Sequence, residues 1–169
     1  RIYSTFTVGS RNEMNPEKMM KDIFEKTVTD EVIGRIDNLD STKAPLWGSM
    51  NASQMLAHCS VTYELVYDNK HPKPKGVKKL LLKWFVKGIV TNEKPYKKGS
   101  PTAPEFKIVD KKEFGTEKQR LVNYLTKTQE LGKAHFDGKE YHSFGKLTAT
   151  EWNNMFYKHL DHHLTQFGV

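Results

Sequence analysis

Apolar side chains recur at helical spacing over residues 15–39 and again from residue 51 onward. Asn15-Pro16 is typical of a helix start, because proline is well tolerated at the first helical position, and we expect a break near Thr29. Asn51 and Gln54 form a capping-box pattern that opens the second stretch. The apolar stripes comprise Met19, Ile23, Phe24, Val28, Val32, Ile33, Ile36 and Leu39, then Met55, His58, Cys59, Thr62, Leu65 and Val66.

Two further helices are predicted in the second half of the chain. Thr116 to Gln119 is a capping-box pattern, and its helix is expected to run towards a stop at Gly132. Thr148 to Glu151 is a second such pattern, and it precedes the last helix. The apolar positions of this last helix are Trp152, Met155, Phe156, Leu160, Leu164 and Phe167.

The segment between the second and third predicted helices contains a short amphipathic piece, residues 77–90, followed by loops rich in Gly and Pro. Residues 106–109 could form a strand, but no other pattern supports a sheet-based core. The sequence therefore predicts an all-α fold, a four-helix bundle with a long crossover between helices 2 and 3. We expect one bundle domain over residues 15–169 and interpret residues 1–14 as an N-terminal extension, native or added.

Composition narrows the class of protein. The chain has 169 residues, of which 37% are hydrophobic and 28% are charged, so one folded domain is expected. No apolar run is long enough for a transmembrane helix, and the N-terminus lacks a signal-peptide pattern. The single cysteine, Cys59, excludes an intramolecular disulfide and a multi-cysteine zinc site, and we expect it to be buried. These observations predict a cytoplasmic location.

The net charge of +7 is concentrated in one segment. Residues 70–98 hold ten lysines and one acid, Glu93, so this segment carries +9 and the rest of the chain carries −2. We interpret it as an amphipathic helix packed on the bundle with a solvated lysine face. The alternative is a basic adaptor that contacts nucleic acid or anionic lipid through residues 70–98. No nucleic-acid partner is expected under the first interpretation.

Three of the seven histidines are candidate metal ligands. His159 and His163 lie four residues apart, on the inward stripe of the last helix, and His58 lies on the inward stripe of the second. Protonated imidazoles facing one cavity would repel one another, whereas a divalent cation would bind all three neutral rings. The alternative is that they are core histidines bonded to neighbouring polar groups.

Four other polar residues could line the same pocket or orient the ligands. Gln54 and Thr62 lie four residues before and after His58, while Asp161 and His162 lie between the other two candidate ligands. Ordinary interhelical hydrogen bonds or surface positions explain them equally well. Among the carboxylates, Glu64 is at most a candidate base, and the capping box accounts for Glu151.

Several motifs resemble one known family. They are Trp47-Gly48-Ser49-Met50-Asn51 leading into Met55-Leu56-Ala57-His58, Pro101-Thr102-Ala103-Pro104-Glu105-Phe106, Phe144-Gly145-Lys146-Leu147-Thr148, and Tyr157-Lys158-His159-Leu160-Asp161-His162-His163-Leu164 with Gln166-Phe167-Gly168. From about residue 19 onward the chain resembles a bacterial branch, of unknown function, of the DinB/YfiT-like superfamily of metalloenzymes. The resemblance implies a four-helix bundle with a long crossover and a metal held by His58, His159 and His163. It places His162 where the family has a histidine that is generally not a ligand.

The resemblance also implies a range of functions. Characterised members of the superfamily include transferases and an isomerase that use low-molecular-weight thiols. We therefore expect a metal-dependent S-transferase or hydrolase that acts on a small-molecule substrate, with Zn or Ni as the metal. A non-catalytic bundle that binds a metal or a small ligand is the alternative. A homodimer is compatible with the apolar crossover.

Overall fold

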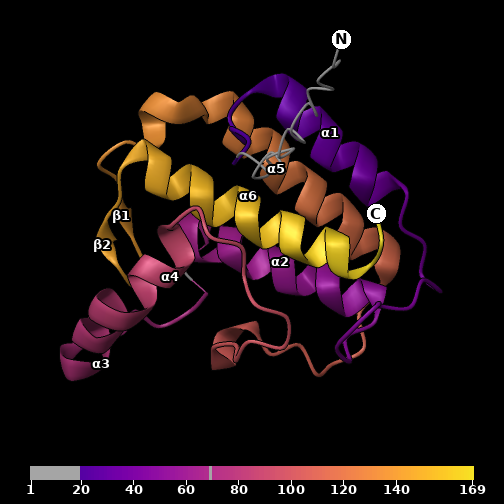
Figure 1. Ribbon diagram of the computed structural model, residues 1–169, viewed down its shortest axis with the longest axis horizontal. Coiled ribbons are helices and arrows are strands. Elements are labelled where there is room, and N and C mark those ends of the chain that lie inside the picture. Colours follow the sequence, from indigo (N-terminus) through magenta and orange to yellow (C-terminus); the bar gives the residue numbers. More distant parts are fainter. Residues whose placement is uncertain (1–19, 69) are drawn as a thin grey trace, which may run out of the picture.

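The computed structural model describes residues 20–68 and 70–169, and this part of the chain is mostly helical (Figure 1). The expected extension over residues 1–14 and the helix start at Asn15-Pro16 lie outside the described residues. The elements, in chain order, are α1 (Lys26–Asp37), α2 (Ala52–Tyr67), α3 (Gly76–Leu81), the π-helical turn η1 (Leu82–Val86), α4 (Lys87–Thr91), the 3₁₀ turn η2 (Pro104–Phe106), α5 (Phe114–Phe136), β1 (Glu140–Tyr141), β2 (Gly145–Lys146) and α6 (Ala149–Gln166).

Among the described residues, the first helix begins at Lys26 and has no break at Thr29. The structure assigns no helix to residues 20–25, and α1 then runs without interruption through Thr29. The Thr29 hydroxyl is buried and donates to the carbonyl of Ile23 (2.6 Å). This hydrogen bond ties the non-helical turn to the helix, so the irregular backbone lies before the helix rather than within it.

Helix α2 and helix α6 begin where their capping boxes predict. The Asn51 side chain accepts from the Gln54 backbone, and the Gln54 side chain accepts from the Asn51 amide. Thr148 and Glu151 make the same reciprocal pair at the start of α6. Each pair supplies partners for backbone amides that the first helical turn leaves unbonded.

Helix α5 departs from its prediction at both ends. Its N-cap is Glu113 rather than Thr116, because the Glu113 carboxylate accepts from the amides of Gly115 and Thr116. An anionic cap is favourable at the positive end of a helix. Gly132 adopts φ 73°, which interrupts the helix as predicted, but helical structure continues after this kink to Phe136.

Helices α1, α2, α5 and α6 pack alongside one another and enclose the core (Figure 1). Helix α5 contacts the other three, and α6 contacts α1 and α2. Aromatic rings fill the centre, where Phe156 stacks on Tyr63 with ring centroids 4.9 Å apart. The largest fully buried side chains are Trp152, Tyr63, Phe136, Phe156, Phe167, Ile23, Ile36, Met55, Leu56, Leu121, Leu125 and Leu147.

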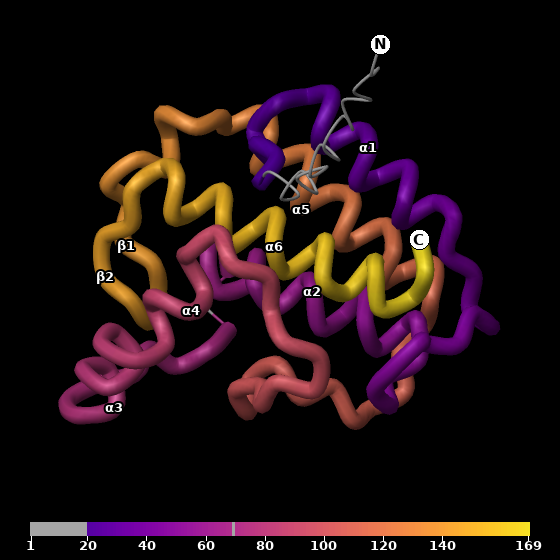
Figure 2. Tube along the Cα trace, in the orientation of Figure 1, coloured from indigo at the N-terminus to yellow at the C-terminus, as the bar shows by residue number. Residues whose placement is uncertain are grey.

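The only strands among the described residues form a small antiparallel hairpin, β1–β2, just before α6. The apolar alternation at residues 106–109 forms no strand; Phe106 is the last residue of η2, in the long segment between α4 and α5. Figure 2 shows this segment running across α6 and α2. It brings the aromatic residues Tyr96 and Phe106 onto the two helices that carry the candidate ligands.

The amphipathic piece is helical, as predicted, but its wide apolar face is not packed on the other helices. That face is exposed, with Trp84 73% accessible, and consists of Val77, Leu80, Leu81, Trp84, Phe85 and Ile89. A narrower stripe of Leu82, Val86 and Val90 contacts the core instead. A helix in contact with the body along one side can bury only the residues on that side. Within the described residues, no helix combines the length and apolar character needed to cross a membrane.

Candidate metal centre

Three imidazole rings, one from α2 and two from α6, meet between the two helices. One ligand atom from each of His58, His159 and His163 lies within 4.8 Å of the others. The ring centroids are 4.9 Å apart for His58 and His159, 4.4 Å for His58 and His163, and 4.8 Å for the pair on α6. The i, i+4 spacing puts His159 and His163 on one face of α6, and the packing of α2 on α6 brings His58 to them, as the family resemblance implies.

Each ring uses Nδ1 to bond an outer partner. Nδ1 of His58 lies 2.8 Å from the carbonyl of Phe106, which can only accept, so this nitrogen carries the proton. Nδ1 of His163 lies 2.8 Å from Oε1 of Gln166, whose amide nitrogen donates to the carbonyl of Trp47 (2.6 Å). Both rings are thereby held with Nε2 unprotonated, as metal-ligating histidines usually are.

The third ring has a partner that can either donate or accept. Nδ1 of His159 lies 3.0 Å from the hydroxyl of Thr62, and its Nε2 lies 3.0 Å from Nε2 of His58. Without a metal, His159 must donate from Nε2, because Nε2 of His58 can only accept. Thr62 then donates to Nδ1. If Nε2 of His159 held a metal, the proton of this ring would be on Nδ1 and the Thr62 hydroxyl would accept that hydrogen bond.

Burial keeps the three rings neutral. It lowers the pKa of His58, although the hydrogen bond to Phe106 opposes the shift. Burial, with the neighbouring imidazoles, lowers the pKa of His159 well below its usual value and that of His163 to about 3. Neutral imidazole is the form that binds a metal, so the folded chain presents ligands that need no deprotonation near neutral pH.

The residues fit a divalent metal on donor chemistry and spacing. Two imidazole nitrogens on one tetrahedral zinc ion lie about 3.3 Å apart, given Zn–N distances of about 2.0–2.1 Å. The two facing Nε2 atoms of His58 and His159, at 3.0 Å, are close to this separation. Three neutral nitrogen ligands suit Zn or Ni and leave coordination positions for water or a substrate.

Aromatic side chains surround the three rings. Phe106 contacts both His58 and His159, and Tyr96 contacts His159 from the crossover segment. His162, half-buried, lies between the rings of Tyr96 and Trp47 and outside the group of three ligand atoms. Burial lowers the pKa of His162 as well. It therefore lies beside the three rings, in contact with His163.

Of the other residues singled out in the sequence, only some contact the three histidines. Thr62 orients His159, but the Gln54 side chain caps α2, and Asp161 pairs with Arg35 of α1 (2.8 Å). Cys59 is fully buried, as expected, and burial raises the pKa of its thiol. Glu64 pairs with Arg120 of α5 and with His71 (3.0 Å), away from the three ligands.

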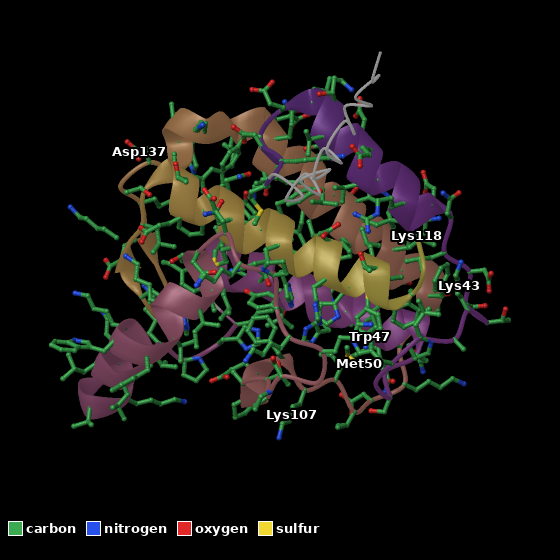
Figure 3. All side chains as sticks on the ribbon, in the orientation of Figure 1. Lys43, Trp47, Met50, Lys107, Lys118 and Asp137 are labelled. Carbon is green, nitrogen blue, oxygen red and sulfur yellow. The ribbon has the colours of Figure 1, made fainter. Side chains whose placement is uncertain are left out.

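Sequence reasoning missed two features that position the ligands. One is Gln166, which follows His163 by three residues on α6, a spacing that could have revealed it. The other is the Trp47-Gly48 turn beside the end of α6 (Figure 3), where Gly48 has φ 84°. A Cβ at position 48 would lie 2.6 Å from Nε2 of Gln166, so glycine lets the turn and the amide approach closely. No sequence signal marks the carbonyl of Phe106.

Comparisons with known proteins place the chain in a family but supply no function. Searches of curated proteins and of solved structures gave no match. One family model, described as "Protein of unknown function (DUF1569)", matches residues 19–168. That range includes every helix and strand given above and all three candidate ligands. The chain therefore belongs to the DUF1569 family of proteins of unknown function.

Proposed function

We propose that this protein is a divalent-metal-dependent enzyme built on the DinB-like four-helix plan. Helices α1, α2, α5 and α6 would be the four helices of the bundle, and the segment from α2 to α5 would be its long crossover. Two observations support the assignment: the ligands come from the second and last of these helices, and the crossover supplies the carbonyl that orients His58.

One observation carries the proposal: His58 and His163 are locked with Nδ1 bonded outward and Nε2 unprotonated, and His159 can adopt the same form. A purely structural cluster of buried histidines needs only satisfied nitrogens. Here His58 and His159 bring two Nε2 atoms together at 3.0 Å, where only one of them can carry a proton. A cation in this position would accept both lone pairs.

The residues of the chain would bind the metal and orient its ligands. His58, His159 and His163 would hold the metal. Thr62 orients the ring of His159, and Gln166 orients the ring of His163, each through a hydrogen bond to Nδ1. A bound metal would supply Lewis-acid chemistry, stabilising a thiolate or hydroxide near neutral pH. The rings of Tyr96 and Phe106 cover the ligands on the crossover side. The proposed substrate is a small molecule.

The nucleophile must come from outside the protein if the reaction is thiol transfer. Cys59 follows a ligand in the sequence, but its thiol is buried against Met55 and stays protonated because burial raises its pKa. A low-molecular-weight thiol is therefore the proposed co-substrate, and it would attack an electrophilic carbon and displace a leaving group. Hydrolysis with water as the nucleophile is the second reaction that the same centre would support.

The first test measures metal content per chain by plasma mass spectrometry, on protein never exposed to a nickel resin. Wild type is compared with His58→Ala, His163→Ala and the control His135→Ala, whose ring is on the surface of α5. We expect near-stoichiometric metal in wild type and control, and its loss in both ligand variants. Absence of metal from wild type, even after Zn or Ni is added, would overturn the proposal.

A second measurement separates catalysis from simple metal binding. Thiol consumption is followed with metal-loaded protein, a low-molecular-weight thiol and an alkylating electrophile. Turnover that is lost in His163→Ala and kept in His135→Ala supports the transferase. If panels of thiols and of hydrolysable esters give no turnover while metal binds stoichiometrically, the catalytic part is refuted and a non-catalytic metal-binding bundle stands.

A further inference from the structure

The helical segment from α3 through α4, residues 76–91, has apolar side chains on two faces. One stripe packs against the core, and the other, larger face is open to solvent. This open face holds six of the nine large apolar side chains that are exposed in the described residues. Exposed apolar side chains that recur on one face of a helix mark an interaction surface, unlike apolar residues scattered singly over a protein. We call it the crossover face: Val77, Leu80, Leu81, Trp84, Phe85 and Ile89.

The backbone of the segment is hydrogen-bonded to α6 at its C-terminal end. Lys158 of α6 donates to the carbonyls of Ile89 and Asn92 (2.8 and 2.6 Å), and Asn154 donates to the carbonyl of Thr91. These bonds hold the C-terminal end of α4 on α6. The opposite end, α3, projects from the main group of helices (Figure 1). A projecting helix can present its apolar face to a flat surface without disturbing the core.

The positive charge of the segment indicates what kind of partner the crossover face binds. Residues 70–98 carry a net charge of +9, and Lys79, Lys83 and Lys87 recur at helical spacing beside the crossover face. Lys78, Lys79 and Lys87 approach acids of the body at 3.6, 3.6 and 2.8 Å, which offsets part of this charge. Two copies joined through this face would bring two such segments together and repel, whereas an anionic surface would be attracted.

We propose that the crossover face docks on an anionic lipid surface. Trp84, Phe85 and Leu81 would enter the boundary between headgroups and acyl chains, and the flanking lysines would contact lipid phosphates. Trp, Phe and Leu on one face with lysines beside them are the composition of helices that lie in a membrane interface. This inference is independent of the metal centre, because none of its residues contributes a ligand.

The test is co-sedimentation of the full chain with vesicles of phosphatidylcholine alone or of phosphatidylcholine and phosphatidylglycerol in equal amounts. We expect binding to the mixed vesicles, weakened by salt, and little binding to the neutral ones. Trp84 serves as a second readout, because its emission should shift to the blue as it leaves water. Trp152 is already buried in the core and should not respond.

Two sets of variants test the two parts of the surface. Leu81→Ala with Trp84→Ala should weaken binding to mixed vesicles about a hundredfold, since each lost side chain costs about tenfold. Lys75→Gln, Lys78→Gln and Lys83→Gln together should also cost about a hundredfold, at about fivefold per lysine. The matched control is Val109→Ala, which removes an apolar side chain that is 82% exposed elsewhere.

Four outcomes would overturn the proposal. The first three are no binding to mixed vesicles, equal binding to both vesicle types, and undiminished binding by the Leu81→Ala, Trp84→Ala variant. The fourth is a wild-type protein that is dimeric without lipid while this variant is monomeric. The last would assign the face to a second copy of the chain. Salt-sensitive binding to duplex DNA, with no lipid binding, would assign the lysines to nucleic acid and equally refute the membrane role. Because all the changed side chains are on the surface, circular dichroism should confirm that each variant is folded.

Discussion

The neutral state of His163 has a consequence for stability that can be measured without metal or substrate. In the folded chain, burial lowers the pKa of this ring to about 3, against an ordinary value of 6.5. The unfolded chain therefore binds a proton at His163 below about pH 6.5 and the folded chain does not. Stability must then fall as the pH is lowered through 6.5, and it is unaffected by this group at higher pH.

The size of this loss of stability follows from the linkage between proton binding and folding. Between about pH 7.5 and about pH 5, the proton taken up only by the unfolded chain destabilises the folded state by about 2 kcal/mol. With a urea dependence of about 2 kcal/mol/M, this corresponds to a shift of roughly 1 M in the unfolding midpoint. His58 and His159 add shifts of the same sign, because burial lowers both of their pKa values. Over this pH range, wild type should therefore lose more stability than His163 alone accounts for.

The assay is urea unfolding of metal-free protein across this pH range, with chelator present. His163→Gln removes the titrating group, keeps a polar side chain of similar size, and should lose about 2 kcal/mol less than wild type over the range. The control His135→Gln, on the surface, should keep most of the wild-type dependence; desolvation and the neighbouring Lys139 lower the pKa of His135 too, so its loss removes a contribution of the same sign. If His163→Gln and wild type have the same pH dependence, the ring is not held neutral by burial and the electrostatic reasoning fails.

Three further substitutions test how the site and the crossover are held. Thr62→Val should lower zinc affinity about tenfold in a chelator competition, because Nδ1 of His159 loses its hydrogen-bond partner. Thr62→Ser keeps the hydroxyl and should bind zinc as wild type does. If Thr62→Val bound zinc as tightly as wild type, Thr62 would not orient His159. Gly48→Ala should lower the free energy of unfolding, measured in urea, by about 1–2 kcal/mol, because position 48 has a positive φ. The added Cβ should also displace the side chain of Gln166. Lys158→Met should destabilise the fold by about 1–3 kcal/mol and speed amide exchange in α4, since the partly buried carbonyls of Ile89 and Asn92 lose their donor. Unchanged exchange would show that Lys158 does not anchor the helix.

Local signals determined much of the helical structure. Capping boxes at Asn51 and Thr148 fixed two helix starts, because the pattern acts through side chains only three residues apart. The i, i+4 spacing placed His159 and His163 on one face of α6 for the same local reason. Errors arose where a competing local group took over, as when Glu113 rather than Thr116 capped α5. The resemblance to a known family, rather than periodicity, is what paired these two histidines with His58.

Tertiary structure alone decided what surrounds these elements. The carbonyl of Phe106 and the amide of Gln166 orient the ligands only because the crossover and the Trp47-Gly48 turn pack there, contacts that span many residues and leave no periodic signal. The exposed face around Trp84 was predicted to be packed, because a sequence shows that a helix is amphipathic but not which neighbour covers its apolar side. Periodicity fixes the side of a helix on which a residue lies; only the packing of the whole chain fixes what that side meets.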